Sequence, residues 1–174
     1  TTATTRLGEG DRLLDVSVLS GSQLVLLTED GMALRFAVSE ISEMKKASAG
    51  VKGITLRPGD EVVGMDLLHR DAEVLTVTQE GFGKRTSVEE YRRQTRGGKG
   101  LINLKVTDKT GPVVGIKVVH DEQELMLITA GGIVIRMNVA DISVYGRSSQ
   151  GVKLMSTGEE DQVVSLATVE QKSE

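Results

Sequence analysis

Short runs of hydrophobic residues that alternate with polar ones recur along this chain. Leu14, Val16 and Val18, for example, are interleaved with Asp15 and Ser17, which is the period of a β-strand that buries one face. No stretch shows the spacing of an amphipathic helix. The pattern predicts an all-β protein, with a strand around 13–18 and, further on, strands over 62–68, 72–78, 82–86 and 101–106.

Three segments of the chain align with one another at a spacing of 50 or 51 residues. They read LTEDGMALRFAVSEI from Leu27, VTQEGFGKRTSVEEY from Val77 and ITAGGIVIRMNVADI from Ile128. A glycine and, four residues later, an arginine keep this register, as Gly31 with Arg35, Gly81 with Arg85 and Gly132 with Arg136. Such self-similarity indicates a repeat protein. We expect repeats over approximately 11–60, 61–111 and 112–161, with partial repeats at 1–10 and 162–174.

The sequence pattern of each repeat predicts four short strands separated by turn residues. Gly81 and Gly132 stand at the tight reversals, where a positive φ is often required. Four strands in each repeat of this length are typical of a propeller, in which no unit buries its hydrophobic face without a neighbour. We therefore expect a single domain over 1–174, a propeller-like partial ring of three full four-stranded blades with partial ends.

Composition narrows the class of protein further. With 174 residues, 39% of them hydrophobic, the chain can bury a real core, which excludes a disordered protein. Its lack of cysteine excludes disulfides, thiol nucleophiles and zinc–thiolate sites, and favours a reducing compartment. No apolar run approaches the ~20 residues that span a bilayer, and 1–10 has no signal-peptide pattern. We expect a soluble cytoplasmic protein without a membrane partner.

Charge is distributed unevenly along the chain. The net charge of −4 argues, by itself, against binding to nucleic acid. Between 84 and 99, however, six cations stand against only Glu89 and Glu90, and other acids gather elsewhere. Segregated charge of this kind suits a polyanionic partner.

The segment 94–100, which reads QTRGGKG, is the most informative loop. Gly97 and Gly98 stand between Arg96 and Lys99, and the backbone N–H groups of such a turn can point at one anion. The flanking cations would add charge-assisted contacts to phosphate oxygens. The alternative is a solvated hairpin, but partly equivalent loops recur in register, which favours phosphate binding.

One basic loop per blade would place cations at intervals around a rim that could shape bent duplex DNA. Bending ~20–30 base pairs costs on the order of 1–6 kcal/mol, which several phosphate contacts could offset. For the arginines on strands, the alternative is an aliphatic stem that covers the sheet while the charged head stays in water. The candidate DNA-binding residues are Lys45, Lys46, Lys84, Arg85, Arg92, Arg93, Arg96, Gly97, Gly98, Lys99, Arg147 and Lys153, with Arg35, Lys52 and Arg136 as weaker candidates.

Other chemistries lack the residues they need. Aromatic residues make up 2% of the chain, too few for the stacking platforms of single-strand binders, so duplex is the favoured form. His69 and His120 have neither a cysteine nor a third histidine to complete a metal site. Tyr91 aligns with Ile41 and Ile142, which indicates core packing rather than catalysis. We expect no catalytic centre, metal or cofactor.

The combination of these motifs resembles a known family. The E-G-x3-R pattern, the RGGKG loop and the G-D-x-V-V strand opening are similar to the C-terminal domain of the A subunit of bacterial DNA gyrase, and topoisomerase IV is the close relative. The resemblance implies a β-pinwheel, whose blades exchange strands and whose basic perimeter wraps duplex DNA. It also implies a parent A2B2 complex with the gyrase B subunit, in which ATP and Mg act through other domains to support negative supercoiling.

Two departures from the family pattern leave alternatives open. The family's box reads Q-R-R-G-G-R/K-G, and Thr95 stands where a basic residue is expected. The chain also covers about half of the ring that the resemblance implies, so the first blades are expected upstream. A topoisomerase IV domain, and a propeller that binds proteins rather than DNA, are the alternative interpretations.

Overall fold

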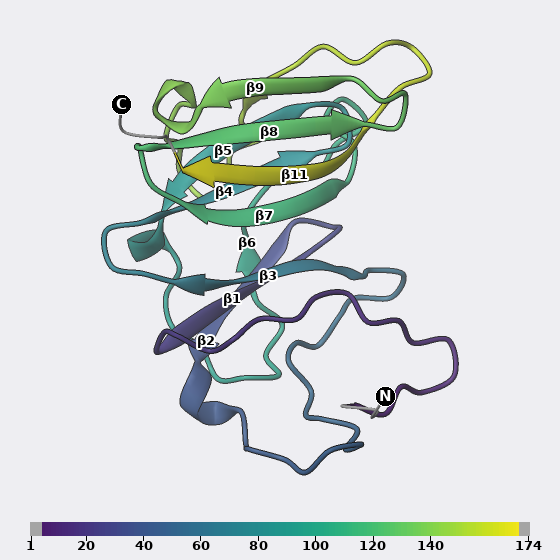
Figure 1. Ribbon diagram of the computed structural model, residues 1–174, viewed down its shortest axis with the longest axis vertical. Coiled ribbons are helices and arrows are strands. Elements are labelled where there is room, and N and C mark those ends of the chain that lie inside the picture. The colour runs from purple at the N-terminus through teal and green to yellow at the C-terminus, as the bar shows by residue number, and fades with distance from the viewer. Residues whose placement is uncertain (1–4, 171–174) are drawn as a thin grey trace.

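The computed structural model describes residues 5–170, which form eleven strands in three antiparallel sheets (Figure 1). The first sheet has the order β3-β1-β2-β6, with β1 at Gln23–Thr28, β2 at Met32–Ala37, β3 at Val62–Leu68 and β6 at Leu101–Ile102. The second has the order β10-β5-β4-β7, with β4 at Glu73–Thr78, β5 at Phe82–Ser87, β7 at Val113–Val119 and β10 at Val152–Lys153. The third has the order β11-β8-β9, with β8 at Gln123–Thr129, β9 at Val134–Asn138 and β11 at Val163–Glu170.

Each sheet is a hairpin of one repeat that is completed by strands of the following repeat. The hairpin β1–β2 takes β3 on one side and β6 on the other, and both come from the second repeat. The hairpin β4–β5 takes β7 and β10 from the third repeat in the same way. Because both edges of a hairpin carry unpaired backbone groups, this exchange satisfies them and links successive repeats. The predicted all-β, propeller-like fold is confirmed, with the four strands of one repeat shared between two sheets.

Short 3-10 turns follow the second strand of each hairpin, at η1 (Val38–Glu40), η2 (Val88–Glu90) and η3 (Val139–Asp141). Within the described part of the chain no helix is long and apolar enough to cross a membrane.

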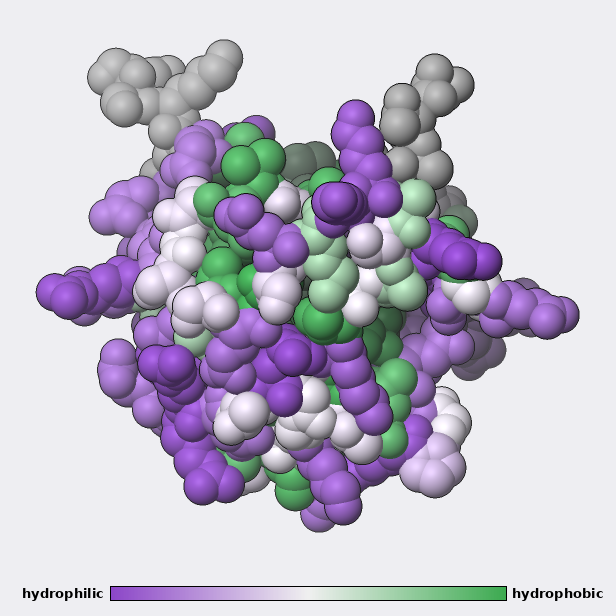
Figure 2. Space-filling view, turned by 90° about the horizontal axis from the view of Figure 1, so that it is seen from below, coloured by the Kyte–Doolittle hydropathy of each residue, from purple (hydrophilic) through white to green (hydrophobic). Residues whose placement is uncertain are grey.

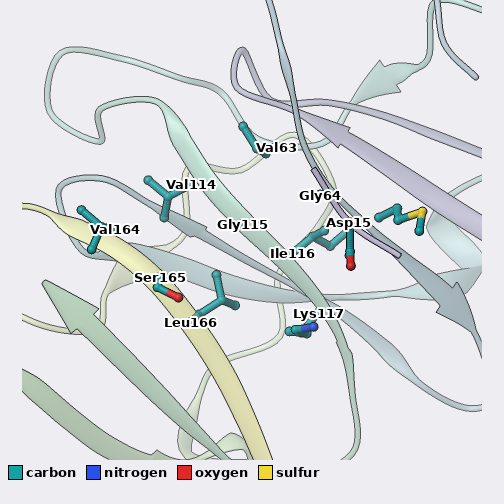
Figure 3. A pocket seen from close by; sticks show the side chains of 11 residues that line it. Asp15, Val63, Gly64, Val114, Gly115, Ile116, Lys117, Val164, Ser165 and Leu166 are labelled. Atoms are coloured by element: carbon teal, nitrogen blue, oxygen red, sulfur yellow. The ribbon is translucent and has the colours of Figure 1, made fainter. Parts of the chain in front are cut away.

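The inner strands β3, β7 and β11 lie side by side, each from a different sheet (Figure 1). Gly64 on β3 allows this approach, because a Cβ there would lie 2.9 Å from Cγ2 of Ile116 on β7. Gly115 on β7 makes the same room for Leu166 on β11, and Figure 3 shows these side chains along the neighbouring strands. A glycine in a strand interior is expected where another element comes this close.

The hydrophobic core lies between successive sheets. Val25 and Leu27 of β1 pack in one cluster with Val74 of β4. Leu75 of β4 packs in another with Leu125 of β8. Each sheet therefore buries its face against the next, as a repeat architecture requires.

The prediction of a strand around 13–18 is wrong. Residues 11–20 form no strand, and Leu14, Val16 and Val18 are exposed by 46%, 74% and 87%. The equivalent strands β3, β7 and β11 pair with the hairpin of the preceding repeat, and no such hairpin precedes 11–20 in the described residues. The fourth strand is also shorter than predicted, because Asn103 bends inward and donates its N–H to the carbonyl of Gly31 at 2.8 Å.

Candidate nucleic-acid interface

Lys84 lies in the interior of the protein, which corrects the prediction that it contacts DNA. Its side chain is fully buried, and Nζ donates to the carbonyls of Asn103 at 2.7 Å, Gly146 at 2.8 Å and Arg147. Burial lowers the pKa of Lys84 to about 8, Glu90 opposes this shift, and Arg147 adds to it. An ammonium whose three donors are used inside the protein is not placed to contact phosphate.

Arg85 joins two blades instead of facing solvent. Its side chain is only 7% exposed and pairs with Glu73 at 2.7 Å and with Asp121. Its Nε donates to the carbonyl of Ile142 at 2.6 Å, directly after η3 of the next repeat. The prediction of a DNA contact at Arg85 is therefore corrected to a structural contact.

Arg35 makes the equivalent contact one repeat earlier. Its guanidinium donates to Gln23 Oε1 at 2.6 Å and to the carbonyls of Val88 and Tyr91 at 2.8 and 3.0 Å, around η2. The charged head is thus bound to protein across the junction between the two blades. Arg136, the third of the series, is 58% exposed and pairs with Glu124 on the adjacent strand. The recurring arginine therefore joins two blades wherever the 3-10 turn of the next repeat is present.

The Gly97-Gly98 turn is not a phosphate-binding nest, which corrects the prediction. The N–H of Gly97 donates to the carbonyl of Gly53 at 2.7 Å, and the N–H of Gly98 donates to the carbonyl of Thr95 at 3.2 Å. Gly97 has φ of 81°, a conformation that glycine adopts without strain. Because these N–H groups are already paired, the turn fixes the shape of the loop and does not offer donors to an anion.

Arg96 and Arg147 are held in place by the same pattern of hydrogen bonds. The backbone N–H of Arg96 donates to Glu40 Oε2 at 2.8 Å, and that of Arg147 donates to Glu90 Oε2 at 2.8 Å. Their guanidinium groups donate to the carbonyls of Lys52 and Ile102 respectively. Sequence reasoning missed the two glutamates, although their spacing of 50 residues (90 − 40) matches the repeat and was a usable signal.

The remaining candidates are exposed, and several lie at outer sheet edges. Lys99 is followed by Gly100 and then by β6, and Lys153 lies on β10; these strands occupy the sheet edges opposite the inner strands β3 and β7. Lys153 Nζ lies 5.6 Å from the ring centroid of Phe82, and Lys109, which sequence reasoning missed, lies 5.3 Å from the same ring. The exposed candidates are Lys45, Lys46, Lys52, Arg92, Arg93, Lys99, Arg136 and Lys153.

One end of the molecule presents both polar and apolar surface. Figure 2 views the end of the molecule that holds the N-terminal segment and shows hydrophobic patches bordered by hydrophilic side chains. Arg93 is 59% exposed and lies 3.8 Å from Glu40, so the glutamate offsets part of its charge. Among residues 5–170 no group of three His, Cys, Asp or Glu side chains is arranged to hold a metal.

The strand exchange and the edge cations together define a repeat domain of the propeller class. A family model described as "DNA gyrase C-terminal domain, beta-propeller" matches 22–69, 72–120 and 123–170. The chain therefore belongs to the DNA gyrase C-terminal domain family, as its motifs indicated.

Individual relatives agree with this assignment. The chain is 44% identical to the DNA gyrase A subunit of Staphylococcus aureus over 169 residues, which are 95% of this chain and 19% of that protein. The chain thus spans about a fifth of the length of its curated relatives. The C-terminal domain of a DNA topoisomerase IV superposes with a TM-score of 0.91 at 30% identity, over 96% of this chain and 53% of that one. A DNA gyrase A C-terminal domain shares the fold, with a TM-score of 0.80 at 24% identity, over 87% and 52%.

Proposed function

We propose that this domain binds and bends duplex DNA without sequence preference, through phosphate contacts along the outer edges of its sheets. The observation that carries the proposal is the placement of Lys99 shortly before β6 and of Lys153 on β10, the edge strands of successive sheets. In this proposal the repeats, taken as 11–60, 61–111 and 112–161, act as one DNA-binding domain.

The chemistry of these cations suits a phosphate backbone. Exposed lysine and arginine side chains neutralise phosphates and displace condensed counterions, so affinity does not depend on base sequence. Arg92 and Arg93 extend the positive surface along the loop that leads to Lys99. Contacts on successive blades would offset the ~1–6 kcal/mol that bending a short duplex requires.

We further propose that the parent protein is a gyrase A subunit. The 44% sequence identity between this chain and a gyrase A subunit favours a gyrase parent over a topoisomerase IV parent. In this proposal the domain has no catalytic role of its own. It holds DNA for the ATP-driven supercoiling reaction of an A2B2 complex with the B subunit, in association with the nucleoid. A full-length A subunit with and without this domain, assayed with the B subunit on relaxed plasmid, tests the assignment, and equal supercoiling by both would contradict it.

Titration of a labelled duplex of ~40 base pairs at several salt concentrations tests DNA binding directly. We expect the logarithm of affinity to fall linearly with the logarithm of salt concentration, with a slope of about −0.9 for each phosphate neutralised. A flat response would contradict the proposal and favour a domain that binds proteins.

A pair of matched variants locates the contact surface. Replacing Lys99 and Lys153 by Gln should weaken binding and make the slope shallower by up to about 1.8. The control replaces Arg70 and Lys117 by Gln, which changes the net charge equally but just after the inner strand β3 and on the inner strand β7. Equal losses in both variants would mean that overall charge, not the outer edge, determines affinity.

A further inference from the structure

The interior of the second blade carries a polar network at positions that are apolar or glycine in the other repeats. Asn103 Nδ2 donates to Thr76 Oγ1 at 2.8 Å, Tyr91 OH donates to Asn103 Oδ1, and Lys84 Nζ donates to the Asn103 carbonyl at 2.7 Å. None of the four residues is more than 1% exposed. Their counterparts are Leu26, Leu34, Ile41 and Gly53 in the first repeat, and Leu127, Ile135, Ile142 and Leu154 in the third.

Lys84 reaches from this network to the basic loop of the third repeat. Two of its three acceptors, the carbonyls of Gly146 and Arg147, belong to the loop itself. In the first blade, Leu34 occupies the equivalent position and meets the equivalent loop by van der Waals contact, because a Cβ on Gly98 would lie 3.5 Å from its Cδ1. The lysine thus replaces a nonspecific apolar contact with the loop by two directed hydrogen bonds to it.

Other contacts hold the rest of this loop to β5. Thr86 Oγ1 donates to the carbonyl of Tyr145 at 3.0 Å, and the N–H of Tyr145 donates to the carbonyl of Arg85 at 2.8 Å. Glu90 accepts from the N–H of Arg147 at 2.8 Å on the outer side. Arg147 is therefore fixed by Glu90 from outside and by Lys84 from inside.

We propose that Lys84 is a positioning residue for DNA binding, which orients the third-repeat loop so that Arg147 meets a phosphate. The inference rests on the proposed function, because Arg147 must contact DNA for its orientation to matter. Lys84 itself does not touch DNA. Without its ammonium, the buried carbonyl of Asn103 and the partly buried carbonyl of Arg147 lose a donor, whereas the carbonyl of Gly146 keeps the hydrogen bonds from Ser149. The loop is then expected to turn its unpaired carbonyl toward water.

A double-mutant cycle in the full chain tests the proposal. Lys84→Leu places at this position the residue that the first repeat holds there, and Lys84→Met is the second variant should the first fail to fold. Either is expected to make the salt slope of duplex binding shallower by about 0.9, the value of one phosphate. In an Arg147→Gln background the same change is expected to leave the slope unaltered, because the contact that Lys84 positions is already gone. Equal losses in both backgrounds would overturn the positioning role.

Amide hydrogen exchange gives a readout that does not depend on DNA. In Lys84→Leu, exchange is expected to accelerate in 145–149 and to stay unchanged in the matched loop 95–99, which Leu34 supports. Unchanged exchange in 145–149 would overturn the inference even if the wild-type domain binds DNA. Faster exchange there in a domain that binds no duplex would overturn the positioning role and the proposed function, while the contact between Lys84 and the loop would stand.

Discussion

The guanidinium of Arg85 donates from Nε to the carbonyl of Ile142, 2.6 Å away, and so joins the second blade to the third. The same side chain pairs with Glu73 on the neighbouring strand of its own sheet. Arg35 makes the corresponding junction between the first and second blades through Val88 and Tyr91. The arginine four residues after the turn glycine therefore explains how repeats that share strands also keep a fixed orientation.

Arg85→Met is expected to lower the free energy of unfolding by about 3 kcal/mol, because it leaves Glu73 without its buried partner and removes the donor to Ile142. Urea denaturation followed by circular dichroism measures this difference. Arg136→Met is the control, since its pair with Glu124 is exposed and should contribute less than about 1 kcal/mol. Similar losses in the two variants would contradict the junction role.

The sequence predicted the hairpins well but could not assign their partners. The predicted strands 72–78 and 82–86 correspond to β4 and β5, because alternation and the turn at Gly81 are local signals. The alternation of apolar and polar residues indicates which face of a strand is buried but not which other strand pairs with it. For that reason the sharing of strands between sheets came only from the family resemblance, and the segment around 13–18 was predicted as a strand although its partner is absent from the described residues.

The site was predicted less well because charge was taken as a sign of exposure. Lys84 aligns with Leu34 and Ile135, so the repeat itself indicated a buried position. Arg35 and Arg85 recur in register for a structural reason that periodicity cannot distinguish from binding. Lys99 and Lys153 were predicted as candidates, and their exposure is consistent with that interpretation.

Stability should depend on pH through Lys84. Its pKa is about 8 in the folded chain against an ordinary value of 10.5, so between these values the unfolded chain binds more protons. The free energy of unfolding therefore rises with pH in this window, by about 1.5 kcal/mol between pH ~8 and pH ~9.5, because the full slope of about 1.36 kcal/mol per unit applies only well above the folded pKa. Tyr91, whose pKa burial raises, acts with the opposite sign only above pH 10. Urea denaturation of wild type and Lys84→Leu at both pH values measures the effect, and an equal rise in the variant would assign it to other groups.

Thr95→Arg is expected to strengthen duplex binding. Thr95 is exposed in the loop beside Arg96, and its carbonyl, not its side chain, accepts the hydrogen bond that closes the turn. An added arginine should make the salt slope steeper by about 0.9 if it reaches a phosphate. Thr95→Gln is the neutral control for side-chain length. A tighter complex with an unchanged slope would show that the new side chain contacts something other than phosphate.

Gly100→Ala should disrupt the strand exchange, whereas Gly50→Ala should not. Both glycines have positive φ, at 79° and 82°, so an alanine at either costs about 1–2 kcal/mol in backbone strain. At Gly100 the new Cβ would also lie 2.7 Å from the carbonyl oxygen of Ala33 on β2, while at Gly50 nothing lies within 4 Å. We therefore expect Gly100→Ala to lower the urea midpoint clearly more than Gly50→Ala, and to accelerate amide exchange in Leu101 and Ile102. Equal effects at the two positions would mean that backbone strain alone, and not the close approach of β6 to β2, requires the glycine.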